Sequence, residues 1–337
     1  MALAPISWAI AAGSSAATAW VVTPLVRALG ERGRVLDRPT SRSLHSVPTP
    51  RTGGLAILAA CAMGIVPLVS PDRQLQAILA AVLAIAVVGG VDDVWGVGAP
   101  ARLGAQAVIA IALATGADVA LPLVGTDHPA LGVALSVFWL IGIANAYNFM
   151  DGINGIASVE AIVASGALAL LALRHGDGDA ALVLMAILGA CAGFLPWNFP
   201  SGSIFMGDAG SGMLGLAFAA LILRVATRPA DLVAATLPLL PFLLDAGATL
   251  LDRTLRRENI LTPHRSHYYQ RLVALGYSHT AVTTVWGSLA LVGAAGALAF
   301  DRAGTLPRLL IVGAVLAVHV FAALVIARRE RLARYRD

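Results

Sequence analysis

The 337-residue chain is 58% hydrophobic and only 12% charged, with a formal net charge of +4. A soluble domain of this length would carry roughly 25% charged residues, so the composition excludes an ordinary soluble enzyme. All 23 basic residues are Arg and none is Lys, which excludes chemistry based on a lysine amine.

Apolar stretches of about 17–25 residues recur along the whole chain, and each can cross a bilayer as a helix. We therefore predict an all-α, polytopic integral membrane protein with a single transmembrane domain over 1–337. The stretches lack the alternation of a membrane β-barrel. About eleven spans are expected, near 6–28, 53–70, 75–91, 102–118, 130–147, 156–173, 181–197, 209–224, 230–251, 279–299 and 306–327.

The arginines are distributed unevenly between the two sides of this predicted topology. Seventeen of the 23 fall on one side, which the positive-inside rule assigns to the cytoplasm. With eleven spans, the N-terminus is expected outside and the C-terminus in the cytoplasm. The first charge, Arg27, ends the first stretch, so this stretch is predicted to be a retained helix and not a cleaved signal peptide. Basic residues beside spans favour lipid headgroups as partners and argue against nucleic acid.

The predicted cytoplasmic loops hold almost every group suited to chemistry, and the loops on the other side are short and chemically bland. The cytoplasmic loops are 29–52, 92–101, 148–155, 198–208 and 252–278. A transporter needs polar groups near the bilayer midplane. A catalyst working at one membrane face needs them gathered at one end, and the sequence favours this second arrangement.

The first two loops carry groups suited to phosphate and metal. Arg38, Arg42, Arg51 and His45 could bind phosphate groups, or simply lie beside anionic lipid. In the second loop the paired Asp92-Asp93 carboxylates repel each other, so one must bind a cation or hold a proton. Such a pair suits a Mg²⁺–phosphate site, although a polar helix end is the simpler interpretation.

The third and fourth loops add amides and two further carboxylates. Asn148, Asp151 and Asn154 are spaced by three and share one face if helical. Gly152 allows close approach of the backbone to a ligand. Asp208 begins an apolar stretch and is either a helix N-cap or a metal ligand.

The fifth loop contains His264, Arg265 and His267, a compact cluster of hydrogen-bond donors. No Cys lies nearby, so anion binding is favoured over zinc, and a pH-dependent surface loop is the alternative. Asp245, inside the ninth stretch, could serve a transporter or could face a cytoplasmic cavity.

Several motifs occur in a specific order along the chain: Pro48-Thr-Pro-Arg-Thr-Gly-Gly54, Asp92-Asp93, Asn148-Phe-Met-Asp-Gly-Ile-Asn-Gly-Ile-Ala157, Phe205-Met-Gly-Asp-Ala-Gly-Ser211 and His264-Arg-Ser-His267. Together they resemble the polyprenyl-phosphate N-acetylhexosamine-1-phosphate transferases, the superfamily that includes WecA, TagO and MraY. The His-Arg-Ser-His form is similar to the WbpL-like and WecA-like branches. Gly96 stands where MraY has a Lys, so peptidoglycan synthesis is the less favoured role.

The resemblance implies a bacterial inner-membrane enzyme with its active site on the cytoplasmic face. Such enzymes transfer a sugar 1-phosphate from a UDP-N-acetylhexosamine to undecaprenyl phosphate, release UMP, and begin a surface polysaccharide. They require Mg²⁺, with Mn²⁺ as an alternative cation, and the sequence is compatible with a homodimer. The alternatives are an MraY-type phospho-MurNAc-pentapeptide transferase or, in a different class, a transporter or flippase of an anionic lipid or sugar nucleotide.

The resemblance also implies roles for individual residues. Asp208 would be the Mg²⁺ ligand, Asp92 and Asp93 would handle metal or lipid phosphate, with one as a base, and Asp151 would complete the acidic set. The remaining predicted site residues are Arg51 and Arg102 for the lipid phosphate, and Asn148, Gly152, Asn154, Asn198, Phe205, His264, Arg265 and His267 for the nucleotide and sugar. Many members have an Asp at the position of Asn154, whereas the amide of Asn154 supplies no charge.

Overall fold

The computed structural model describes residues 4–39, 44, 46–122, 128–260, 262 and 264–334, and these form an all-α fold with one very short hairpin. In chain order the elements are α1 (Ala4–Gly33), β1 (Leu36–Asp37), β2 (Thr49–Pro50), α2 (Gly53–Ile65), α3 (Arg73–Trp95), α4 (Ala99–Gly116), α5 (Pro129–Met150), α6 (Ile156–Arg174), α7 (Gly178–Asn198), α8 (Gly207–Val225), α9 (Pro229–Thr236), the 3₁₀ turn η1 (Leu237–Leu239), α10 (Leu240–Leu255), α11 (Tyr268–Ala274), α12 (His279–Arg302) and α13 (Thr305–Arg334).

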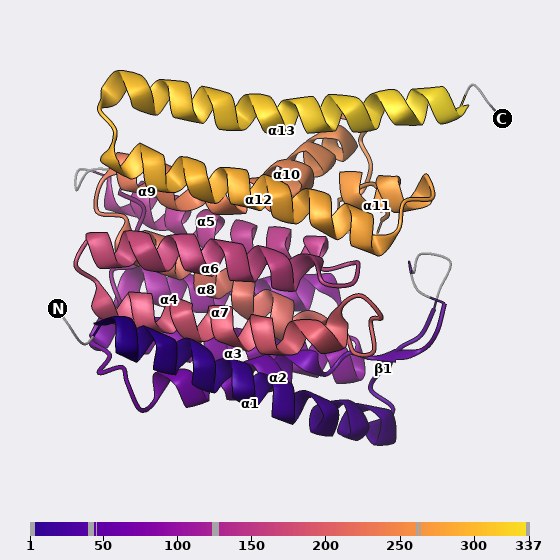
Figure 1. The fold of residues 1–337 in the computed structure, drawn as a ribbon, viewed down its shortest axis with the longest axis horizontal. Coiled ribbons are helices and arrows are strands. Elements are labelled where there is room, and N and C mark those ends of the chain that lie inside the picture. The colour runs from indigo at the N-terminus through magenta and orange to yellow at the C-terminus, as the bar shows by residue number, and fades with distance from the viewer. Residues whose placement is uncertain are drawn as a thin grey trace.

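The prediction of a polytopic helical membrane protein is confirmed. Within the described residues, ten helical segments are long and apolar enough to cross a membrane. The predicted second span is represented by α2, whose 13 residues reach only about 20 Å against a hydrocarbon core of about 30 Å. Helix α1 begins at one end of the bundle and α13 finishes at the other (Figure 1), as an odd number of crossings requires. Which end faces the cytoplasm stays a prediction.

The predicted ninth span is not one continuous helix. It consists of α9, the turn η1 and α10, with prolines at Pro229, Pro238 and Pro241. A proline inside a helix removes a backbone donor and clashes with the preceding turn, so the helix is interrupted there. The interruption leaves α10 as a separate helix that carries Asp245 beneath α11.

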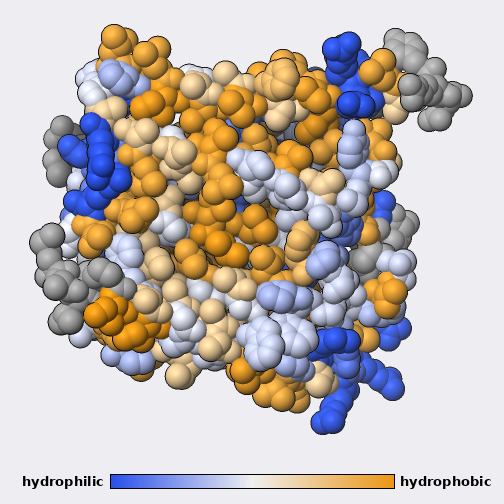
Figure 2. Space-filling model, in the orientation of Figure 1, coloured by the Kyte–Doolittle hydropathy of each residue, from blue (hydrophilic) through white to orange (hydrophobic). Residues whose placement is uncertain are grey.

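Helix α8 is the core of the bundle and is buried along nearly all of its length. Its many Gly and Ala residues allow close packing with α3 and α5 on either side. The outer helices expose large apolar side chains such as Leu309 and Phe321. On the face drawn in Figure 2, apolar residues cover the middle of the molecule and hydrophilic residues gather toward its two ends, which suits a protein surrounded by lipid.

Short turns at one end of the bundle place the predicted site residues. Strands β1 and β2 pair antiparallel, with Leu36 opposite Pro50 and Asp37 opposite Thr49, and they lead directly into α2. Gly96 adopts a left-handed conformation with φ of 69° and ends α3 just after the paired aspartates. Gly155, with φ of 80°, similarly begins α6. These turns bring the ends of successive helices to one face.

Candidate active site

Polar side chains converge at the end of the bundle where α3, α5 and α7 finish and α6 and α8 begin. They surround a cavity of about 390 Å³. Ten of the fourteen predicted site residues line it: Arg51, Asp93, Asn148, Asp151, Gly152, Asn154, Asn198, Phe205, Asp208 and His264. The other four, Asp92, Arg102, Arg265 and His267, lie outside the lining. Arg42 and His45, predicted for the first loop, fall outside the described residues.

Asp208 lies in the first turn of α8, between the cavity and the predicted residues Asp92 and Arg102, which lie outside the lining. Its Oδ1 accepts a hydrogen bond from Asn148 Nδ2 at 2.9 Å, and its Oδ2 accepts one from Arg102 Nη1. The same Arg102 nitrogen donates to Asp92 Oδ2 at 2.8 Å. One guanidinium therefore joins the Asp92 and Asp208 carboxylates, so α3, α4 and α8 meet at a single cation.

The two adjacent aspartates of α3 have different surroundings. Asp93 accepts from the backbone N–H of Asp208 at 3.1 Å and from that of Ala209 at 3.0 Å, so both of its oxygens hold the start of α8. Asp92 Oδ1, in contrast, is buried and accepts no hydrogen bond from any described residue. An unsatisfied buried carboxylate oxygen is costly, and such groups mark functional sites. Asp92 is thus the member of the pair with an oxygen that has no hydrogen-bond partner among the described residues.

Arg51 approaches the same cluster from the segment between β2 and α2. Its Nε donates to the backbone carbonyl of Asp93 at 3.0 Å and lies 3.7 Å from Asp93 Oδ1. The helices can come this close because Gly54 and Gly89 have no side chains. A Cβ on Gly54 would lie 2.7 Å from Gly210 Cα, and one on Gly89 would lie 2.6 Å from the backbone nitrogen of Ala209.

Asp151 closes the cavity at the C-terminus of α5. Its side chain makes no ion pair with any described residue. Its enclosed position and the nearby carboxylates of Asp208 and Asp93 raise the pKa of Asp151 well above its usual value. Asn148, one turn earlier, also donates to Ser211 Oγ at 2.8 Å. Asp151 therefore has no cation partner among the described residues, whereas the nearby Asp93 and Asp208 pair with Arg51 and Arg102.

Two of the predicted amides already have partners within the protein. Asn198 is buried, accepts from the backbone N–H of Gly155 at 2.7 Å and donates to the carbonyl of Ile204 at 2.9 Å. Asn154 Nδ2 donates to the carbonyl of Pro200 at 2.8 Å. Asn198 uses both ends of its amide to tie the third loop to the fourth. Asn154 and Phe205 also lie among the residues that line the cavity.

The histidine cluster adjoins the cavity through His264. His264 lines the cavity, with Nδ1 2.9 Å from Ser266 Oγ. Burial, together with the nearby His267 and Arg253, lowers the pKa of His264 to about 4, so it is neutral at physiological pH. His267 is buried beneath it, with the two ring centroids 5.0 Å apart, and Arg265 is exposed. His264 thus offers a neutral hydrogen-bonding group to the cavity.

Seven lining residues were not predicted: Asp37, Leu44, Ile153, Gly207, Ser211, Gln270 and His279. Ser211 follows Asp208 by three positions, and that helical spacing could have identified it. Gln270 similarly follows His267 by three. His279 begins α12, and nothing in its local sequence marks it as part of the site.

No group of three or more His, Cys, Asp or Glu side chains suited to a metal occurs in the part of the chain that the structure describes. Mg²⁺ needs fewer protein ligands than that, because it is commonly held by one or two carboxylates together with substrate phosphates. Asp208 and Asp92, which share one cation and leave a buried oxygen without a partner, fit this mode of binding.

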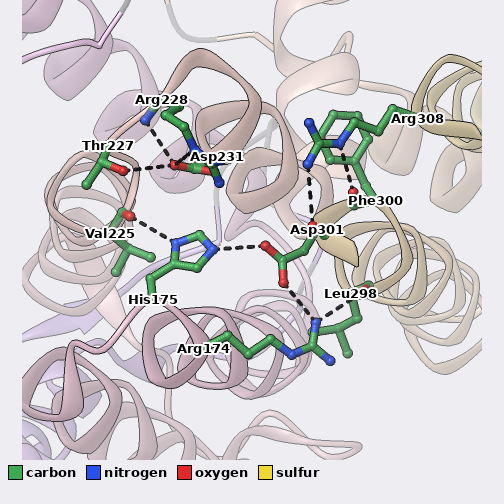
Figure 3. A network of polar contacts seen from close by, with 10 residues as sticks. All are labelled: Arg174, His175, Val225, Thr227, Arg228, Asp231, Leu298, Phe300, Asp301 and Arg308. Atoms are coloured by element: carbon green, nitrogen blue, oxygen red, sulfur yellow. Dashed lines mark hydrogen bonds and ion pairs between the residues drawn. The ribbon is translucent and has the colours of Figure 1, made fainter. Parts of the chain in front are cut away.

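A second polar cluster lies at the far end of the bundle (Figure 3). His175 Nε2 and Arg174 Nη1 both contact Asp301, at 2.9 and 3.1 Å. Arg224 contacts Asp177 at 2.7 Å and Asp72 at 2.8 Å. A cavity of about 680 Å³ lies beside these groups. The loops that were predicted to be bland therefore hold several charges, but these charges are paired with one another.

Comparison with known proteins gives concordant matches. The family described as "Glycosyl transferase family 4" matches residues 75–226, which include Asp93, Asp151 and Asp208 of the cavity lining. The probable undecaprenyl-phosphate N-acetylglucosaminyl 1-phosphate transferase of Bacillus subtilis is 29% identical, over 78% of this chain and 76% of its own length. The decaprenyl-phosphate N-acetylglucosaminephosphotransferase of Mycobacterium tuberculosis is 29% identical, over 94% and 88%. A phospho-N-acetylmuramoyl-pentapeptide-transferase of Desulforudis audaxviator is 32% identical, over 60% and 71%.

Proposed function

Because the chain belongs to the polyprenyl-phosphate N-acetylhexosamine-1-phosphate transferase superfamily, we propose that it transfers an N-acetylhexosamine 1-phosphate from a UDP-sugar to undecaprenyl phosphate. The products are UMP and a lipid-linked diphosphate sugar. The Bacillus and Mycobacterium relatives, which match 78% and 94% of the chain, are named for N-acetylglucosamine, so UDP-N-acetylglucosamine is the first donor to test. Deoxy forms of the sugar are further candidates.

The position of Asp208 carries the proposal. On one side it faces a cavity with an aromatic ring, amides and a neutral histidine, which suits a nucleotide sugar. On the other side it meets Arg102, which suits a lipid phosphate arriving from the bilayer. Donor and acceptor phosphates would therefore meet at the Asp208 carboxylate.

The reaction needs positioning and charge neutralisation more than it needs a strong base. An oxygen of the lipid phosphate attacks the phosphorus that bears the sugar, the bond from this phosphorus to the bridging oxygen breaks, and UMP leaves. A phosphate monoester with a second pKa of about 6 is already largely ionised at neutral pH. Arg102 and Arg51 would hold it in place while negative charge accumulates at the transferring group.

Asp208 and Asp92 would hold a Mg²⁺ ion, with Mn²⁺ as an alternative. When bound, the positive charge of the ion would offset the negative charge of the phosphates. Asp151 would lie beside them as a further acid. Phe205 would stack on the uracil, Asn154 Oδ1 would accept a hydrogen bond from the nucleotide, and His264 would bond the diphosphate or the sugar while remaining neutral. Asp93 and Asn198 would act by holding these groups in place.

The proposed setting is the cytoplasmic face of a bacterial inner membrane, where UDP-sugars are available. The product would be the first lipid-linked sugar of a surface polysaccharide. The uneven distribution of Arg supports this orientation, because the candidate active site lies at the Arg-rich end.

The test is release of UMP by purified protein supplied with undecaprenyl phosphate, Mg²⁺ and each UDP-N-acetylhexosamine in turn. At least one donor should give UMP and a lipid-linked sugar in equal amounts. Omission of the lipid phosphate or addition of a chelator should stop the release. UDP-MurNAc-pentapeptide belongs in the same screen, because its exclusive use would indicate the MraY-type role. Absence of UMP with every donor would refute the proposal.

A further inference from the structure

Asp245 is a buried acid that the proposed reaction does not use. It lies in α10, within a segment long and apolar enough to span a membrane, and is 4% exposed. It does not line the candidate active site. A carboxylate in such a position is costly, and it is retained where it makes several specific hydrogen bonds or serves function.

The hydrogen bonds of Asp245 are directed at the start of α11. Its Oδ1 accepts from the backbone N–H of Tyr268 at 2.8 Å, and its Oδ2 accepts from that of Tyr269 at 3.1 Å. Thr249 Oγ1 and His267 Nδ1 lie 3.3 and 3.4 Å from the same Oδ1. Asp245 therefore fixes the peptide that immediately follows the His264–His267 segment.

Tyr269 extends this connection to the other wall of the site. Its hydroxyl donates to the backbone carbonyl of Phe149 at 3.0 Å, and Gln270 Nε2 donates to the same hydroxyl at 3.1 Å. Phe149 lies between Asn148 and Asp151. The ring of Tyr269 packs where a side chain on Gly152 would be, since a Cβ there would lie 3.1 Å from its Cζ. Two hydrogen bonds, both made by Tyr269, thus connect Asp245 to the segment that carries Asp151.

We propose that Asp245 is a positioning residue, which acts through Tyr269 to set the His264–His267 segment against the segment that carries Asn148 and Asp151. The inference rests on the proposed function, because it concerns the geometry of that same site. Asp245 is also the one residue that could have supported a transporter function. The positioning role explains it without transport, because both of its oxygens accept hydrogen bonds from the backbone of α11.

Asp231 offers a matched control at the far end of the bundle. It is 3% exposed, lies in the first turn of α9, and accepts from the backbone N–H of Arg228 at 2.9 Å and from Thr227 Oγ1 at 3.1 Å. Asp245→Asn and Asp231→Asn each turn one carboxylate oxygen into an amide nitrogen that cannot accept a hydrogen bond. Each should therefore lower the unfolding temperature by a similar amount.

Only Asp245→Asn should change the kinetics of UMP release. Its kcat/KM for the UDP-sugar should fall about tenfold to a hundredfold, with a rise in KM contributing, because the two walls that hold the donor lose their register. Tyr269→Phe removes the contact with Phe149 and should act in the same direction. The Asp245→Asn/Tyr269→Phe double variant should lose less than the product of the two single losses, because the residues act in series.

Hydrogen–deuterium exchange tests the connection without relying on turnover. Asp245→Asn should speed amide exchange in the 264–274 segment and also in 148–152, whereas Asp231→Asn should speed it only around 228–236. Unchanged exchange in 148–152, or a kcat/KM equal to that of wild type, would overturn the inference. If wild-type protein releases no UMP, the proposed function fails while the exchange experiment still decides whether Asp245 positions these segments.

Discussion

The two ends of the bundle hold their aspartates in different states. At the far end, Asp301 contacts both Arg174 and His175, and Arg224 is shared by Asp72 and Asp177 (Figure 3 shows the Asp301 cluster). At the site end, Asp92, Asp93, Asp151 and Asp208 have only Arg51 and Arg102 as ion-pair partners among the described residues, and Asp92 keeps a buried oxygen that accepts no hydrogen bond from them.

This difference separates a structural cluster from a functional one. Charges that are neutralised inside the protein hold helices together and need nothing further. A cluster with more carboxylate than cation stays incomplete until a ligand brings positive charge, and natural proteins tolerate such local conflicts mainly at functional sites. The comparison therefore predicts that substitutions at the site end reduce activity and that those at the far end alter stability.

The largest contrast is expected between Asp208→Asn and Asp177→Asn. Each replaces one of two aspartates that share an arginine, so the effects on folding should be similar. Asp208→Asn should lower kcat about a thousandfold, by analogy with the loss of a key electrostatic group in other enzymes, because it removes charge at the reacting phosphates. Asp177→Asn should leave kcat within about twofold of wild type. UMP release at saturating substrate and thermal unfolding measure the two effects, and equal losses of activity would contradict the comparison.

Asp92 and Asp93 should differ from each other despite being adjacent. Asp92→Asn should lower kcat about a hundredfold with little change in unfolding temperature, because it alters the carboxylate that has an unoccupied oxygen. Asp93→Asn should cost about 1 kcal/mol of stability, because it loses an acceptor for the start of α8. Kinetics and unfolding of both variants test this division. An Asp93→Asn enzyme of wild-type stability would contradict the capping role.

Gly89 and Gly90 sharpen the comparison through packing. A Cβ at Gly89 would collide with the backbone of Asp208 and Ala209, whereas one at Gly90 would meet only Ala209 Cβ at 4.0 Å. Gly89→Ala should displace Asp208 and lower kcat about tenfold or more, since small displacements of reacting groups are costly. Gly90→Ala should be neutral or slightly stabilising, because alanine is the better helix former. Similar kinetics for the two variants would show that the α3–α8 contact does not set the site.

The sequence could predict that the carboxylates lie at the same end of the bundle, because successive predicted loops alternate between its two ends. Counting spans placed Asp92, Asp151 and Asp208 at one end, although they lie far apart in the chain. Spacing alone could not distinguish Asp92 from Asp93, because their partners depend on how α8 docks against α3. It also could not show that Asn198 spends both ends of its amide on neighbouring loops.

Long-range pairs account for most of what the sequence could not predict. Arg224 and Asp72 are 152 positions apart, and neither carries a local signal of its partner. The far-end loops looked bland for this reason. The division of the ninth span was more accessible, because Pro238 and Pro241 mark it, but hydrophobicity dominated the prediction.

The smallest effect on activity is expected from Asp301→Asn, whose consequence should be a change in the pH dependence of stability. Burial lowers the pKa of His175, but the hydrogen bonds to Asp301 and to the Val225 carbonyl, together with the negative charges of Asp301 and Asp231, outweigh burial and leave the pKa raised above 6.5. A histidine whose pKa is raised by folding contributes stability that is complete below the unfolded pKa and is lost as pH rises through the folded pKa. The wild-type unfolding temperature should therefore fall as pH rises above about 6.5 and through the folded pKa of His175, and Asp301→Asn should flatten this fall. Thermal unfolding across that range measures it, with UMP release at each pH as the control. A slope that persists in Asp301→Asn would remove His175–Asp301 as its cause, and a large loss of kcat would show that the far end is not independent of the site.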